Sequence, residues 1–321
     1  MDNKKIIQWI ASLRGLLVFL VFFSHLTVLP IPKDLMFIIG RIGVVGFFLI
    51  SGHLAVSSLE KRNRKAFLLN RFIRLYPIYW VLLLMTFLLS TKHDFVELVW
   101  NFTLFEEFVG YEPMIGASWM LPIMVLFFLL LVPLKNKSFR ILSYLFYLTC
   151  IGSIALGLLR YTTSKPFPTA LCLLICVGLI GYIQKKLCNG QINSNLIRHI
   201  IFFEITLIIA SSLSYGDKVY WYFIAYNLGF TTYFLFYKYN IKIPVFDKLG
   251  ELGFTFFLGA GIPIQLIKFF IPNIEQYNCY MFCIVNFILA TTFSYIVTKW
   301  CEKPLLKWSS SIEKSFFNPT S

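Results

Sequence analysis

Long apolar runs alternate with short polar loops along most of this 321-residue chain. Each run holds roughly 17 to 25 mostly apolar residues, the length that an α-helix needs to cross a bilayer. The pattern predicts an all-α, polytopic integral membrane bundle of about ten transmembrane helices. We place the spans near Trp9–Leu29, Leu35–Leu54, Ile73–Leu89, Ser118–Leu134, Leu142–Leu159, Pro168–Ile183, Ile200–Leu213, Val219–Tyr237, Phe254–Ile271 and Tyr280–Thr298. Because we find no low-complexity linker, clear repeat or second soluble domain, residues 1–321 are expected to form one membrane domain.

The composition and the charge distribution support this class and orient the bundle. Hydrophobic residues make up 58% of the chain and charged residues only 14%. With a cytosolic N-terminus, 21 of the 29 Lys and Arg residues fall on the inner side and seven on the outer side, with Arg14 embedded. This three-to-one bias follows the positive-inside rule and predicts that both termini are cytosolic. The net charge of +14 is therefore a topology signal, and we expect no nucleic-acid partner.

The metal-ligating residue types are scattered. The seven cysteines show no paired-loop or metal-ligand spacing, and most lie in predicted spans or on the inner side. Free thiols are therefore expected. The four histidines do not cluster either, so the sequence predicts no metal site.

The first apolar run carries two ionisable residues, Arg14 and His25. A step of eleven residues turns a helix by about three turns plus ~20°, so both side chains lie on one face, roughly 16 Å apart. Ionisable groups inside a membrane are costly and usually face a bundle interior or a wet cavity, which favours a functional site. The alternative is that Arg14 snorkels to one interface while His25 lies near the other.

The second run contains a stripe of small residues, Gly40, Gly43 and Gly46, that would let a neighbouring helix backbone come close. Ser51 follows near the inner end of this span.

The most basic stretch of the chain ends at Arg71 and Arg74, which share a helix face if this segment is helical. Pro77 is expected in the first turn of the third span, where its missing N–H costs little. A basic cytosolic loop would by itself explain the charge. Arginine rather than lysine at both positions favours a further role, because the guanidinium group suits bidentate phosphate binding.

Three polar features remain. The loop from Lys92 to Gly116 carries six titratable acidic or histidine side chains, including Glu106 and Glu107. Glu204 lies within the seventh run, and the Gly259–Pro263 stretch interrupts the ninth.

Five stretches in order resemble landmarks of the family-three membrane acyltransferases, bacterial O-acyltransferases of surface polysaccharides and related glycans. They are Arg14 with His25; Gly46-Phe47-Phe48-Leu49-Ile50-Ser51-Gly52; Arg71-Phe72-Ile73-Arg74-Leu75-Tyr76-Pro77-Ile78-Tyr79-Trp80; Ser118-Trp119-Met120-Leu121; and Glu302-Lys303-Pro304. The chain departs from the family pattern at three places. An acidic residue would fall near Met124, a histidine in Gly259-Ala260-Gly261, and an aspartate at Ala11.

The resemblance implies a multi-pass protein of the bacterial cytoplasmic (inner) membrane. It implies transfer of an acyl group, most often acetyl, from cytosolic acyl-coenzyme A to a hydroxyl of a glycan or lipid-linked glycan. His25 would be the general base or an acyl relay, and Arg14 would stabilise the oxyanion or hold the donor. Arg71 and Arg74 would bind the donor phosphates, with Ser51 and Tyr76 in the same donor site. We expect His25 to be buried deep in its span and therefore neutral, and the acidic loop around Glu106 and Glu107 to be the next place to look for a base.

Two other classes compete with this interpretation. A transporter or flippase of a polar or lipid-linked substrate would also need a basic cavity and a broken span, but no matched interruption appears in the other half. A non-catalytic scaffold gives no reason for Arg14 and His25 to share a face.

The charge bias yields a topology prediction. Reporter fusions after Lys137 and Lys186 should read cytosolic, and a fusion between Glu106 and Glu112 should read external, because of the three-to-one distribution of basic residues. An external signal at Lys137 contradicts the ten-span arrangement.

Overall fold

A computed structural model describes residues 3–26, 28–89, 93–192, 195–270, 279–308 and 311. These residues form helices and turns, with no strand among them. The elements are α1 (Asn3–Ser24), α2 (Lys33–Lys61), α3 (Arg64–Leu89), α4 (Phe95–Thr103), η1 (Glu106–Val109), α5 (Met120–Leu131), η2 (Val132–Leu134), α6 (Phe139–Thr163), α7 (Thr169–Cys188), α8 (Leu196–Tyr215), η3 (Gly216–Lys218), α9 (Val219–Tyr239), α10 (Pro244–Glu251), α11 (Gly253–Gly259), α12 (Ile262–Phe270), α13 (Cys279–Val297) and the π-helix η5 (Thr298–Glu302). Lys92 and Lys314, two of the basic residues counted above, lie outside the described residues.

The predicted class, an all-helical membrane protein, is confirmed. Among the described residues, six helical stretches are long and apolar enough to cross a membrane, or seven if a bent pair counts as one span. One of the six, Leu196–Tyr239, contains both α8 and α9. Two shorter apolar helices, Gln8–Ser24 and Met120–Leu134, also occupy predicted spans. The count of ten and the cytosolic location of the termini stay predictions.

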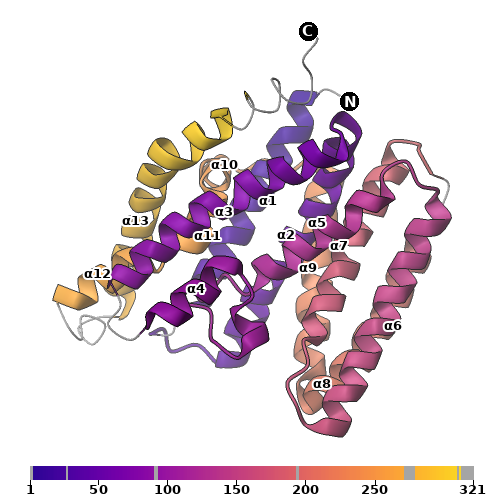
Figure 1. The fold of residues 1–321 in the computed structure, drawn as a ribbon, viewed down its shortest axis with the longest axis horizontal. Helices are drawn as coiled ribbons and strands as arrows, with labels where there is room; N and C mark the ends of the chain where they lie inside the picture. The colour runs from indigo at the N-terminus through magenta and orange to yellow at the C-terminus, as the bar shows by residue number, and fades with distance from the viewer. Residues whose placement is uncertain are drawn as a thin grey trace.

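Helix α2 lies at the centre of the bundle, between α1 on one side and α7 and α9 on the other (Figure 1). The predicted glycine stripe packs against α1: a Cβ atom at Gly43 would lie 2.9 Å from the Leu17 carbonyl oxygen. Towards its other end α2 meets α7 just as closely, since a Cβ at Gly52 would lie 1.9 Å from the Gly178 oxygen. Small residues thus let the helix backbones touch, and these contacts fix the depth of Ser51 in the bundle.

Helix α1 also packs backbone to backbone against α10. A Cβ atom at Gly15 would lie 1.9 Å from the Phe246 oxygen, and one at Gly250 would lie 2.0 Å from the Ala11 oxygen. The buried Ser12 hydroxyl donates to Asp247 and accepts from the Ile243 N–H at 2.9 Å. This contact holds α10, and the chain that follows it, against the helix that carries Arg14.

Helix α3 begins earlier than the sequence pattern predicts. Asn63 starts it, because its side-chain oxygen accepts from the Ala66 N–H at 2.8 Å, as an N-cap residue does. Pro77 therefore lies inside the helix and not in its first turn, so that prediction was wrong. The sequence signal was ambiguous because proline within an apolar run marks either the start of a helix or a tolerated break in one.

The ninth predicted span, Phe254–Ile271, is broken at one place, and a bend lies just before it. The expected interruption is present, because α11 ends at Gly259 and α12 begins at Ile262. A sharper bend of 71° separates α10 from the helix that starts at Gly253. The bend turns α11 away from α10, so that Gly253 and Phe257 face the bundle interior.

The segment between α3 and α5 is anchored by buried polar groups. Tyr79 donates its hydroxyl to the Asn101 carbonyl oxygen at 2.9 Å, and Asn101 accepts from the Met114 N–H at 2.9 Å. Glu106 is also fully buried, yet neither carboxyl oxygen has a hydrogen-bond partner among the described residues. Burial, together with the neighbouring Glu107 charge, raises the pKa of Glu106 to about 7.

Glu106 should make the stability of this segment depend on pH. Its folded-state pKa of about 7 lies above the ordinary value of 4.5, so the folded protein keeps the proton to higher pH. The free energy of unfolding should therefore fall between these pH values and level off above pH 7. Glu106→Gln should remove this loss, so that its thermal unfolding midpoint exceeds that of the wild type at pH 8 and matches it at pH 4.5. The exposed Glu112→Gln is the control, and equal pH profiles for the two variants contradict the assignment.

Candidate functional site

Residues from six elements meet at one cavity, which we call the arginine cavity. It has a volume of about 130 Å³ and is lined by Arg14 from α1, Ser51 from α2, Arg71 and Arg74 from α3, Met124 from α5 and Glu302 from the π-helix, together with apolar side chains including Phe257 of α11. The structure thus brings together four of the predicted site residues, which are separated by up to 60 positions in the sequence.

The charges of the arginine cavity do not balance. Its lining carries three arginines and a single carboxylate, that of Glu302. Arg74 repels both Arg14 and Arg71, while Glu302 attracts Arg14 and Arg74. Clustered cations in an apolar bundle are costly unless an opposite charge joins them. A bound anion would balance this excess of positive charge.

Hydrogen bonds and aromatic rings fix the charged groups in place. Glu302 accepts from the buried Thr255 hydroxyl at 2.6 Å and from Thr298 at 3.3 Å. The π-helix sets this geometry, and single-turn π segments often occur at functional sites. The Arg71 guanidinium lies over the Phe128 ring at 4.5 Å and the Phe67 ring at 5.1 Å, and its Nε atom is buried without a hydrogen-bond partner. Arg71 is thus held by ring faces while its charge stays unneutralised.

His25 lies at the end of α1 and is exposed, so the prediction that it is buried deep in a span was wrong. The helix ends at Ser24 because the chain tightens there: the N–H groups of His25 and Leu26 each bond to a carbonyl three residues back. Two histidines are buried inside spans, His199 in α8 and His53 in α2. His53 is 2% exposed and contacts Gln184 at 3.0 Å and Tyr233 at 2.8 Å. His53 lines none of the cavities described here, so we assign it a structural role.

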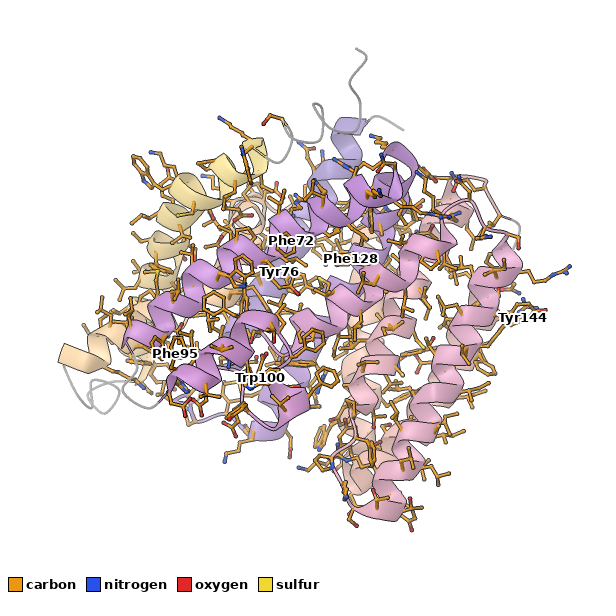
Figure 2. The ribbon with its side chains drawn as sticks, viewed as in Figure 1. Phe72, Tyr76, Phe95, Trp100, Phe128 and Tyr144 are labelled. Atoms are coloured by element: carbon orange, nitrogen blue, oxygen red, sulfur yellow. The ribbon has the colours of Figure 1, made fainter. Side chains whose placement is uncertain are left out.

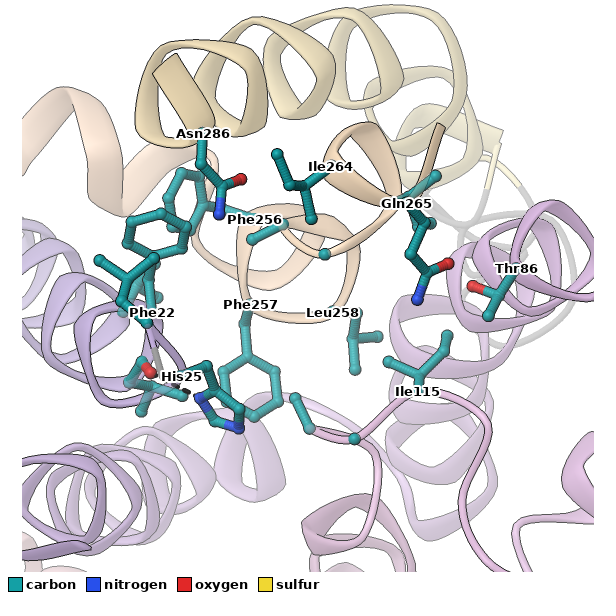
Figure 3. A pocket seen from close by; sticks show the side chains of 18 of the residues that line it. Phe22, His25, Thr86, Ile115, Phe256, Phe257, Leu258, Ile264, Gln265 and Asn286 are labelled. Atoms are coloured by element: carbon teal, nitrogen blue, oxygen red, sulfur yellow. Dashed lines mark hydrogen bonds between the residues drawn. The ribbon is translucent and has the colours of Figure 1, made fainter. Parts of the chain in front are cut away.

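The hydrogen bond of His25 defines which ring nitrogen is free. Its Nδ1 lies 2.7 Å from the Val21 carbonyl oxygen, and a carbonyl only accepts, so Nδ1 carries the proton (Figure 3). In the neutral imidazole the lone pair is then on Nε2. This is the tautomer that a general base needs.

His25 borders two further cavities. The first, the His25 cavity of about 170 Å³, is lined by Phe22, Thr86, Gln265 and Asn286 among others (Figure 3). The second, the Arg41 cavity of about 420 Å³, is lined by Ser24, Lys33, Arg41 and Trp119 among others. Val21, His25, Ala117 and Phe257 line both of them.

Phe257 connects the two ends of the site. Its side chain, 9% exposed, lines the arginine cavity as well as both cavities that hold His25. The ring packs edge-on against Phe47 at 5.7 Å. Phe257 is thus the side chain at which the arginine cavity and the cavities of His25 adjoin.

The remaining predicted residues lie elsewhere. Tyr76 stacks on Phe72 at 4.7 Å and is absent from the lining of the arginine cavity (Figure 2), so its place in a donor site stays a prediction. Glu106 lines none of the three cavities. Glu204 accepts from the Asn227 amide at 3.0 Å, far along the chain from these residues. Among the described residues, no group of three or more His, Cys, Asp or Glu is placed to hold a metal ion.

Two of the five landmarks, Ser118–Leu121 and Glu302–Pro304, resembled the family in sequence, but the sequence alone did not indicate that they line the cavities. Trp119 lines the Arg41 cavity while Met120 and Leu121 line the arginine cavity, so this motif joins the two. Glu302 supplies the only carboxylate of the arginine cavity. Phe257 and Arg41 had no motif signal, because a single aromatic or basic residue in an apolar helix resembles many others.

Two departures from the family pattern fall inside these cavities. Met124, where an acidic residue would be expected, lines the arginine cavity, and its sulfur lies 3.9 Å from the Ser51 hydroxyl. Ala260 and Gly261, where a histidine would be expected, line the His25 cavity. Both substitutions leave His25 as the only imidazole in these three linings and leave the arginine cavity more positive.

The apolar helices and the charged cavities define a multi-pass membrane protein in which three arginines line a cavity on one side of an aromatic ring and an imidazole lines the cavities on the other. The sequence matches the family model for the acyltransferase domain of acyltransferase family 3 over residues 7–297. The chain therefore belongs to acyltransferase family 3 and is a membrane acyltransferase, as the five landmarks predicted. No curated protein and no solved structure matches the chain.

Proposed function

We propose that this acyltransferase moves an acyl group, with acetyl as the first choice, from acyl-coenzyme A to a hydroxyl of a cell-surface polysaccharide or lipid-linked glycan at the bacterial inner membrane. The observation that carries the proposal is the position of Phe257, which borders the arginine cavity on one side and the two cavities of His25 on the other. Family membership supplies the reaction class.

The arginine cavity suits the anionic part of the donor. Guanidinium groups bind phosphate oxygens in a bidentate manner, and the lining has two more cations than anions. A volume of about 130 Å³ admits a phosphate group or a section of the pantetheine arm, so most of the nucleotide would lie outside the cavity. Of the three arginines, Arg14 is the one on α1, the helix that ends next to His25. There it would hold the pantetheine arm or stabilise the developing oxyanion.

His25 suits the acceptor hydroxyl. Nε2 takes the hydroxyl proton as the oxygen attacks the thioester carbonyl carbon, and a tetrahedral oxyanion forms. Collapse of this intermediate breaks the carbon–sulfur bond and expels the coenzyme A thiolate, which recovers the proton from the imidazolium. The products are the O-acyl ester and free coenzyme A.

The arginine cavity and His25 are far enough apart that the donor must be a long molecule. Arg14 and His25 are eleven residues apart on α1, about 16 Å along the helix axis. The flexible pantetheine arm allows the phosphates to stay with the arginines while the thioester reaches the ring of Phe257. The transporter or flippase alternative would also use a basic cavity and a broken ninth span, but the family is one of acyltransferases.

Donor binding should depend on the arginines of α3. Arg71→Ala or Arg74→Ala should weaken coenzyme A binding to the purified protein, because a lost charge-assisted phosphate contact costs roughly 1.5–3 kcal/mol. Lysine at either position should recover only part of the affinity, since it lacks the fork geometry. Arg160→Ala is the matched control, because Arg160 lies over Tyr215 and lines none of the three cavities. Unchanged affinity in both α3 variants would mean that these arginines only anchor the helix.

Transfer should depend on the free nitrogen of His25. His25→Gln keeps hydrogen bonding but not basicity, so the rate of ester formation should drop by about 10²–10⁴-fold with coenzyme A binding retained. Arg14→Lys should lose less activity than Arg14→Ala because it keeps the charge. The control is His93→Gln, since His93 pairs with Glu97 at 2.9 Å outside these cavities. The assay is radiolabelled acyl transfer in membranes, and near-normal transfer by His25→Gln would assign His25 a structural role.

A further inference from the structure

The Arg41 cavity carries positive charge that the proposed transfer does not use. Lys33 and Arg41 line it, and no carboxylate belongs to its lining. Asp34 follows Lys33 in the first turn of α2 but does not line the cavity. A molecule in this space therefore faces two cations and no anion.

Arg41 is held rigidly without being neutralised. Its guanidinium carbon lies 5.0 Å from the Phe37 ring, 5.1 Å from the Trp119 ring and 5.3 Å from the Tyr222 ring. Its Nη1 atom is buried with no hydrogen-bond partner, and no ion pair of Arg41 occurs in the part of the chain that the structure describes. Ring faces fix the plane of a guanidinium group and leave its N–H edge to bind an anion.

His25 lines the same cavity. A molecule that fills this space and brings a hydroxyl to His25 therefore lies beside Arg41 and Lys33. The indole of Trp119, which is partly exposed, adds an apolar surface of the kind against which sugar rings pack. Phe257 lines both this space and the arginine cavity, and the arginines of the latter are already assigned to the donor in the proposed function.

We propose that the Arg41 cavity is the acceptor subsite and that it selects a glycan bearing an anionic group, a carboxylate or a phosphate, close to the hydroxyl that is acylated. This inference rests on the proposed function and names its substrate class. Arg41 is the specificity residue, and Lys33, which is exposed, contributes long-range attraction.

The test compares three probes that share one sugar ring and differ at C6, which carries a neutral hydroxyl in methyl glucoside, a carboxylate in methyl glucuronide and a phosphate in methyl glucoside 6-phosphate; transfer is scored at the hydroxyls that all three share. Binding of each probe to the purified full-length protein is measured first, with coenzyme A at saturation so that the arginine cavity is occupied. Both anionic probes should bind at least tenfold more tightly than the neutral one, or only one of them if the site distinguishes carboxylate from phosphate. Arg41→Gln should reduce this preference about tenfold, and Arg160→Gln, the matched arginine that lies over Tyr215, should leave it intact.

Transfer to the same probes from radiolabelled acetyl-coenzyme A is measured second. The ratio of kcat/KM for anionic over neutral acceptor should fall about tenfold in Arg41→Gln. If the anionic probes bind in an Arg41-dependent manner but no ester forms, the Arg41 cavity is an anion-binding subsite and the proposed function is refuted. Three results would contradict the assignment of this subsite. They are equal ester formation on neutral and anionic probes, a loss of transfer in Arg41→Gln that is the same for all probes, and the absence of a binding preference in the wild type.

Discussion

Electrostatic repulsion among Arg14, Arg71 and Arg74 is the constraint on which the site depends. Three cations share a cavity with the single carboxylate of Glu302 inside an apolar bundle. Such an arrangement persists only if the surrounding helices fix the side chains and an anion joins them in use. The backbone contacts of Gly15 with α10 and of Gly52 with α7 supply that rigidity. The bend at Leu252 and the π-helix then bring α11 and Glu302 to the same point.

Helix α1 carries residues of all three cavities along one face. Arg14 lines the arginine cavity, Val18 and Val21 follow on the same face, and His25 ends the stripe at the other cavities. Arg14 and His25 are thereby held at two levels of the bundle, and Phe257 is the one side chain common to the linings of all three cavities described here.

Sequence periodicity predicted the parts of this arrangement that depend on local structure. The eleven-residue step from Arg14 to His25, the glycine stripe of α2 and the shared face of Arg71 and Arg74 follow from helix geometry alone. The burial of His25 and the position of Pro77 were predicted wrongly, because helix ends are set by turns and caps that hydropathy does not register. Phe257, Arg41 and the carboxylate of Glu302 acquire their roles only through contacts between distant segments, and a single sequence carries no signal for such contacts.

The central claim is that the acyl group enters among the arginines and leaves at His25, at the opposite level of the bundle. The direct measurement reconstitutes the protein in vesicles of known orientation, with radiolabelled acetyl-coenzyme A on one side and a glycan acceptor confined to the other. Ester should form when the donor is on the side of the α2–α3 turn, next to the arginine cavity, and not when the two are exchanged. Equal ester formation in both arrangements, or formation only when donor and acceptor share one side, would contradict this account.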